Sequence, residues 1–186
     1  MYAGHFAAAV TLKAKEPRAP MWGLLVGVGL LDLLFGPFVL LGIERVTLTP
    51  DQPPGFSLDY IDWSHSLLMS VVWSVAFALF FVSRGSKIAF VVGLAVFSHF
   101  LFDIPMHPSD LALWPGSDVR LGLGLWRVLP TGWWWIELGV VLAGCSYYVW
   151  AARRSSEFGG RPVAVTLVIV ALHIFNSPWL SQLNGS

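Results

Sequence analysis

The stretch KIAFVVGLAVFSHFLFDI, residues 87–104, is apolar along most of its length. Its apolar residues do not alternate with polar ones as they would in a half-buried strand, so it predicts a helix. A helix needs about 20 residues to cross the hydrocarbon core of a bilayer. The stretch therefore predicts a transmembrane helix.

Other apolar runs of similar length occur along the chain. They cover residues 21–43, 59–82, 133–152 and 162–180. The 186-residue chain is 56% hydrophobic and 12% charged, whereas soluble domains have about 25% charged residues. We therefore expect an all-α polytopic membrane bundle with about five transmembrane helices and no β-structure. Residues 1–186 should form a single integral-membrane domain.

Two segments fall outside these runs. Residues 1–12 are apolar but too short to span, and we expect a short helix lying against or partly within the bundle. Residues 105–132 form the longest connection and are rich in Pro, Gly and Trp. We expect this external loop to lie on the membrane surface as a cap. Its Gly122 and Gly124 follow no predicted strand, so they give little support to a phosphate cradle.

The basic residues are unevenly divided between the two sides of the predicted bundle. Cytoplasmic loops of membrane proteins carry an excess of Lys and Arg. One side has Lys13, Lys15, Arg18, Arg84, Lys87, Arg153, Arg154 and Arg161, and the other has Arg45, Arg120 and Arg127. This distribution predicts a cytoplasmic N-terminus and an external C-terminus.

Charge and cysteine content exclude several classes of function. The formal net charge is zero and the basic residues form no patch, so we expect no nucleic-acid partner. Cys145 is the single cysteine and lies in an apolar run, which excludes an intrachain disulfide and a cysteine-based zinc or redox motif. The expected partners are membrane lipid and a small amphipathic substrate. Association into a homo- or hetero-oligomer is left open.

Ionisable side chains lie inside the predicted spans, where each charged group costs about 2.5–3.5 kcal/mol at the helix centre. Asp32 is halfway along the first span, and His65 is in the second. His99 and Asp103 are four residues apart in the third. Residues four apart share one face of a helix. A single such residue can be an interhelical hydrogen-bond partner, but four of them indicate a site.

The depths of these side chains can be compared from a helical rise of about 1.5 Å per residue. Counted from the basic side, Asp32 lies about 16 Å deep and His99 about 18 Å. His65 enters from the other side and lies about 20 Å from the same face. If the N-terminal segment dips inward, His5 lies about 12 Å in. We therefore expect four segments to bring these groups together near the middle of the bilayer.

Imidazoles and carboxylates are the usual ligands of zinc and other divalent metals in catalytic sites. A bound metal lowers the pKa of its water toward about 7 and supplies hydroxide. Asp62 shares a helix face with His65, and we expect it to orient a ligand or act as general base. The predicted metal ligands are His5, Asp32, His65, His99 and Asp103.

Four further polar residues are expected to lie away from the cluster or at its edge. His107 should face solvent in the external loop, and Glu44 should be a solvated boundary residue. Glu137 should be interfacial or face the site. His173 should be a structural hydrogen-bonding residue.

The order of these motifs resembles a known family. An N-terminal His5 is followed by Asp32 after a Gly- and Leu-rich run, then by Ser64-His65-Ser66, then by His99-x-x-x-Asp103. This arrangement resembles the YdjM-like family of inner-membrane metal-dependent hydrolases over roughly residues 1–110. The resemblance implies a bacterial inner-membrane location and the same five ligands.

The sequence departs from the family pattern at one acidic motif. The family's Pro-Asp-x-Asp reads Leu31-Asp32-Leu33-Leu34 here, and the Thr of its Thr-His-Ser is Ser64. The loss of one carboxylate makes a mononuclear site more plausible than a two-metal site.

The function expected from these residues is a membrane-embedded, divalent-metal-dependent hydrolase, with zinc as the expected metal. Its substrate would be a lipidic or amphipathic ester or phosphoester. Two alternatives remain open at this stage. One is a haem-binding membrane subunit with His65 and His99 as axial ligands. The other is a proton pathway or an accessory subunit without hydrolase activity.

Overall fold

The structure is a computed structural model that describes residues 1–49, 55–129, 131–158 and 161–179. Within these ranges the chain is mostly helical. Three helices are long and apolar enough to cross a membrane: α2 (Met21–Leu40), α5 (Ser86–Met106) and α7 (Gly132–Ala152). Two shorter apolar helices are α4 (Leu67–Leu79) and α8 (Pro162–Phe175). The predicted N-terminal helix is confirmed as α1 (Ala3–Lys15).

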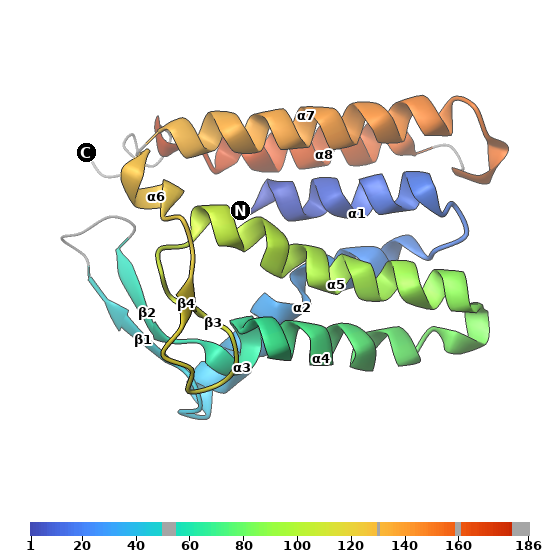
Figure 1. Cartoon of the computed structure of the whole chain (residues 1–186). Coiled ribbons are helices and arrows are strands. Elements are labelled where there is room, and N and C mark those ends of the chain that lie inside the picture. Colours follow the sequence, from blue (N-terminus) through green and yellow to red (C-terminus); the bar gives the residue numbers. More distant parts are fainter. Residues whose placement is uncertain (50–54, 130, 159–160, 180–186) are drawn as a thin grey trace.

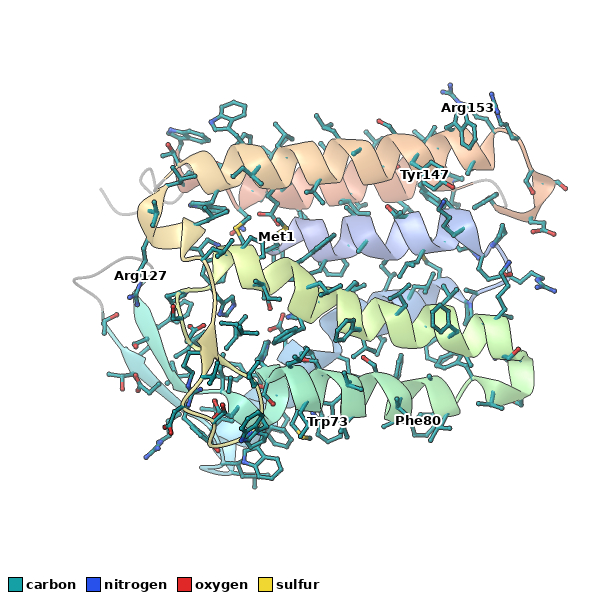
Figure 2. The ribbon with its side chains drawn as sticks, viewed as in Figure 1. Met1, Trp73, Phe80, Arg127, Tyr147 and Arg153 are labelled. Carbon is teal, nitrogen blue, oxygen red and sulfur yellow. The ribbon has the colours of Figure 1, made fainter. Side chains whose placement is uncertain are left out.

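These helices lie side by side in one bundle, with α1 between the α7–α8 pair and the group formed by α2, α4 and α5 (Figure 1). Large apolar side chains project outward along this edge of the bundle, such as Trp73 of α4 and Phe80, the residue after α4 (Figure 2). The hydrocarbon side chain of Phe80 is largely exposed. An outer surface of this kind suits contact with lipid, which requires no polar covering.

The two ends of the bundle differ. One end, which we call the basic end, carries the turns with Arg18, Arg84, Lys87 and Arg153. These turns include the 3₁₀ helices Val82–Arg84 and Ser156–Phe158. The other end is covered by a small cap built from short elements (Figure 1). The predicted external loop over residues 105–132 supplies part of this cap.

The cap contains two small antiparallel sheets, which corrects the expectation of no β-structure. Strand β1 (Arg45–Leu48) pairs with β2 (Phe56–Tyr60), and β3 (Leu111–Ala112) pairs with β4 (Arg120–Leu121). The cap is completed by α3 (Asp62–His65) and α6 (Leu125–Val128). The strands are short and lie outside the long apolar runs, so the periodicity of those runs did not reveal them.

The predicted continuous helix over residues 59–82 is wrong. Residues up to Tyr60 belong to β2, and the backbone of Ser66 is extended, with ψ 156°, so α3 ends there. The Ser66 hydroxyl then accepts the backbone N–H of Met69 and caps α4. Serine is a favoured residue at this position because its oxygen satisfies an amide that the helix leaves free. The break sets the direction of α3, which carries His65.

Helix α1 packs closely on α7, which fixes the position of His5. A Cβ atom at Gly144 of α7 would lie 2.8 Å from the carbonyl oxygen of Ala7, so only glycine permits this approach. At the start of α1, one carboxylate oxygen of Glu137 accepts the backbone N–H groups of Tyr2 (2.7 Å) and Gly4 (2.8 Å). These amides have no partner within their own helix. Glu137 therefore anchors the first turn of α1.

Candidate metal centre

The core of the centre lies on α5, where His99 and Asp103 are both buried. Their spacing of four residues places them one turn apart, and His99 Nε2 lies 3.0 Å from Asp103 Oδ2. The prediction that the two share one helix face is confirmed.

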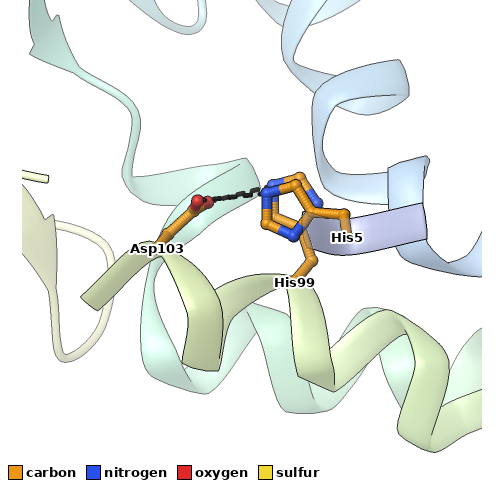
Figure 3. Close-up of side chains that lie close together, drawn as sticks. All are labelled: His5, His99 and Asp103. Carbon is orange, nitrogen blue, oxygen red and sulfur yellow. Dashed lines mark ion pairs between the residues drawn. The ribbon is translucent and has the colours of Figure 1, made fainter. Parts of the chain in front are cut away.

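His5 approaches the same carboxylate from α1. Its Nε2 lies 3.3 Å from Asp103 Oδ1, and its ring stacks on that of His99 with centroids 3.9 Å apart. Figure 3 shows the two stacked imidazoles facing Asp103. The N-terminal segment therefore reaches the centre, as the depth argument predicted.

Asp32 of α2 and His65 of α3 form the other half of the centre. Asp32 Oδ1 lies 3.4 Å from His65 Nε2 and 3.7 Å from His99 Nε2. The imidazoles are buried, whereas the Asp32 side chain is 63% exposed. The centre therefore opens to its surroundings at Asp32.

The five predicted metal residues thus converge. Two sets of ligand atoms each lie within 4.8 Å of one another: His5, His99 and Asp103 form one, and Asp32, His65 and His99 form the other. Either set could hold a metal ion. The two sets share His99, so they are parts of one centre.

The tautomer of His99 follows from the contact of Nδ1, the ring nitrogen that points away from the carboxylates. His99 Nδ1 lies 2.6 Å from the carbonyl oxygen of Val28. A carbonyl can only accept, so Nδ1 must carry the proton. In the neutral ring, Nε2 then has a free lone pair directed at the carboxylates. Metal-binding histidines are oriented by this kind of contact.

Nδ1 of His65, the ring nitrogen that points away from the centre, belongs to a longer hydrogen-bond chain. The Ser64 hydroxyl lies 2.9 Å from both carboxylate oxygens of Glu44 and 2.6 Å from His65 Nδ1. An ionised carboxylate only accepts, so the hydroxyl donates to Glu44 and accepts from His65 Nδ1–H. The lone pair of His65 Nε2 therefore also faces the centre. Glu44 is buried, so the expectation of a solvated boundary residue is wrong.

Burial raises the pKa of Glu44 above its usual value. The backbone N–H and the side chain of Ser64 oppose this shift, because both donate to the carboxylate. Hydrogen bonds to the charged form favour ionisation. Glu44 is thus a buried acceptor held in place by one neighbour of His65.

His107 also faces the centre, so the expectation that it faces solvent is wrong. It is buried, with Nε2 3.8 Å from Asp103 Oδ2 and Nδ1 3.0 Å from Asp110 Oδ1. Its position four residues after Asp103 was a sequence signal for a shared face. The prolines on either side concealed it, because helix α5 continues through Pro105 to Met106.

The backbone of His107 is held by the Gly-x-Gly motif of the loop. Gly124 N–H donates to the His107 carbonyl at 2.7 Å. A Cβ at Gly122 would lie 2.0 Å from the Pro108 carbonyl oxygen and 2.6 Å from that of His107. These glycines therefore allow the cap to close on His107.

Asp62 makes its contacts with the cap. Its carboxylate forms an ion pair with Arg120 at 2.5 Å and accepts the backbone N–H of Gly116 at 2.9 Å. These contacts tie α3 to the loop after α5. The predicted roles of Asp62, as general base or as a residue that orients a ligand, stay predictions.

Glu137 and His173 lie at the α7–α8 interface, and both are fully buried. Glu137 anchors α1 and belongs to neither metal set. The His173 ring stacks on Trp134 with centroids 4.4 Å apart, and its nitrogens have no hydrogen-bond partner among the described residues. His173 is therefore a packing residue here rather than the expected hydrogen-bonding one.

Comparison of the chain with models of known families, with curated proteins and with solved structures gave no match. The resemblance to the YdjM-like family stays a prediction.

Proposed function

We propose that the protein is an integral-membrane, divalent-metal-dependent hydrolase. The supporting observation is the arrangement of acceptors at the centre. Nε2 of His65 and Nε2 of His99 lie 3.0–3.7 Å from the carboxylates of Asp32 and Asp103, and the amino group of Met1 lies 3.2 Å from Asp103 Oδ1. A divalent cation placed among these imidazoles and carboxylates would offset the repulsion between gathered acceptors, which the Met1 amino group offsets only at Asp103.

The ligand set favours zinc. His5, His65 and His99 with Asp32 and Asp103 offer the imidazole and carboxylate donors that zinc binds in catalytic sites. A divalent metal bound there would supply hydroxide at neutral pH. The exposed side of Asp32 leaves room for water and for a substrate to approach. Asp62 is proposed only as an outer residue, because its recorded contacts are with the cap.

The location of the centre suggests the class of substrate. It lies on membrane-type helices and opens at Asp32 on α2, whose neighbour Leu33 is also exposed. A lipidic or amphipathic ester or phosphoester can reach such a site from the bilayer. We further propose five membrane crossings, with α4 and α8 as the shorter ones, and the basic end on the cytoplasmic side. A bacterial inner membrane and membership of the YdjM-like family complete the proposal.

Elemental analysis of the detergent-purified chain tests the metal. We expect the wild-type protein to retain a stoichiometric divalent metal and His99→Ala to lose it. His173→Ala is the matched control, because it removes a buried histidine outside the centre and should keep the metal. Retention of full metal by His99→Ala would refute the assignment.

A proton pathway is the second candidate, and one observation favours it. A series of contacts links Glu44, Ser64, His65, Asp32, His99, Asp103, His107 and Asp110, and the His65–Asp32, Asp32–His99 and Asp103–His107 links, at 3.4–3.8 Å, are longer than ordinary hydrogen bonds. Such chains carry protons in membrane proteins. This function predicts protonated imidazoles and no stoichiometric metal in wild-type protein, so the same elemental analysis separates the two.

The haem alternative is not supported by the geometry. Axial ligands must stand on opposite faces of a porphyrin. The rings of His65 and His99 have centroids 5.4 Å apart at 61°, and both Nε2 atoms contact the same oxygen of Asp32. A macrocycle does not fit between them.

A further inference from the structure

A groove between α7 and α8 lies away from the metal centre, toward the basic end. It has a volume of about 440 Å³. Its walls are mostly apolar and include Leu142, Val149 and Val170. One end is formed by Trp150, Arg153 and Arg154.

The two arginines are free to bind an anion. In the described part of the chain neither guanidinium takes part in an ion pair, and both side chains are exposed. Arg154 lies over the Trp150 ring at 4.2 Å, which holds its side chain at the edge of the groove. Arg153 projects outward from the end of α7 (Figure 2).

We infer that this groove binds an anionic phospholipid, with an acyl chain along the apolar walls and the phosphate at Arg153 and Arg154. The apolar walls argue for a lipid rather than a free anion, because a free anion gains nothing from them. The paired guanidiniums argue for an anionic head group, because arginine binds phosphate through charge-assisted hydrogen bonds. Basic pockets between transmembrane helices bind anionic lipid head groups in this way.

The groove is also placed to affect the bundle. Cys145 lines it, and the adjacent Gly144 is the point where α7 touches α1. A lipid in the groove would bridge α7 and α8 on the side opposite that contact. We therefore expect bound lipid to raise the thermal stability of the whole bundle.

Native mass spectrometry of the detergent-purified full chain tests the inference. The probes are dioleoylphosphatidylglycerol, dioleoylphosphatidylcholine and inorganic phosphate. We expect the wild-type protein to retain phosphatidylglycerol in preference to phosphatidylcholine by about thirtyfold, since each arginine near an anionic lipid contributes about a factor of five.

Two variants and one control define the site. Arg153→Gln/Arg154→Gln should abolish the preference for phosphatidylglycerol, and Ser146→Trp, which fills the groove from α7, should reduce binding of both lipids. Arg84→Gln removes a cation from the same end of the bundle outside the groove, and it should behave as wild type. An unchanged preference in the double variant would overturn the inference, as would retention of inorganic phosphate equal to that of the anionic lipid.

Metal content is measured on the same samples. The groove shares no residue with the metal centre, so the variants should keep the wild-type metal. The lipid inference can therefore fail while the proposed hydrolase stands, and the reverse also holds.

Discussion

Asp103 contacts two imidazoles with its two oxygens: Oδ2 lies 3.0 Å from His99 Nε2 and Oδ1 lies 3.3 Å from His5 Nε2. One carboxylate thus joins α5 to α1. Oδ1 also lies 3.2 Å from the amino group of Met1, so this buried carboxylate has a cationic partner even without metal.

Asp103→Asn is expected to lower the stability of both the metal-bound and the metal-free protein, and that of the metal-bound form by more. With metal it should lower the melting temperature and weaken metal binding by at least about a hundredfold, because a charged ligand is lost. After chelation it should lower the melting temperature by a smaller amount, because only the ion pair with the Met1 amino group is then lost. Thermal unfolding with and without chelator measures both. An equal loss of stability in the two forms would contradict metal binding at Asp103.

Ser64→Ala tests the chain that orients His65. Without the hydroxyl, no described residue accepts the proton of His65 Nδ1. The ring then loses its fixed tautomer and orientation, so metal affinity should fall by about 10–100-fold. A competition titration against a chelator measures the change. Ser98→Ala is the control, because among the described residues its hydroxyl bonds only to the Ala95 carbonyl of its own helix. Equal affinities of the two variants would exclude a role for the chain.

Gly122→Ala should damage the cap more than an ordinary glycine substitution. Its φ is 131°, and the added Cβ would meet the Pro108 carbonyl oxygen at 2.0 Å. Gly116→Ala is the comparison, because Gly116 has φ 81° but open space around its Cβ position. Backbone strain alone costs about 1–3 kcal/mol, as expected for Gly116→Ala. Gly122→Ala should lower the free energy of unfolding by more than this amount, because the steric clash is added to the strain. Unfolding in detergent gives both values.

Glu16 at the basic end gives a prediction for pH. Hydrogen bonds from Lys87 and then Arg18 lower the pKa of Glu16 from 4.5 to about 2. A lowered carboxylate pKa stabilises the fold above the unfolded-state value, and this contribution is lost as pH falls from about 4.5 toward 2. Glu16→Gln should therefore cost about 1–2 kcal/mol at pH 7, since both cations are largely exposed and screened by water. The difference from wild type should disappear near pH 2, and a constant difference would contradict the assignment.

Much of the fold and centre could be predicted from the sequence. Apolar length alone located α2, α5, α7 and the start of α8, because lipid imposes one strict requirement on a spanning helix. The depth argument placed His99 and Asp32 together for the same reason: a regular helix converts sequence position into distance.

The predictions that were wrong concern residues outside the regular helices. His107 follows Pro105, and its burial depends on two glycines of a distant loop whose close approach leaves no periodic pattern. Glu44 is buried because Ser64, across the β1–β2 hairpin, supplies its donors. Contacts of this kind between irregular segments are not encoded by spacing.

The docking of α1 on α7 has a consequence for biosynthesis. Helix α1 spans only Ala3–Lys15 and packs more extensively on α7 than on any other described element. The ribosome makes α1 first, but Glu137 and Gly144, which hold it, emerge more than a hundred residues later. A nascent chain stalled before α7 would therefore contain all five proposed ligands but lack the contacts on α7 that hold the first turn of α1, and α2 and α5 alone would position His5.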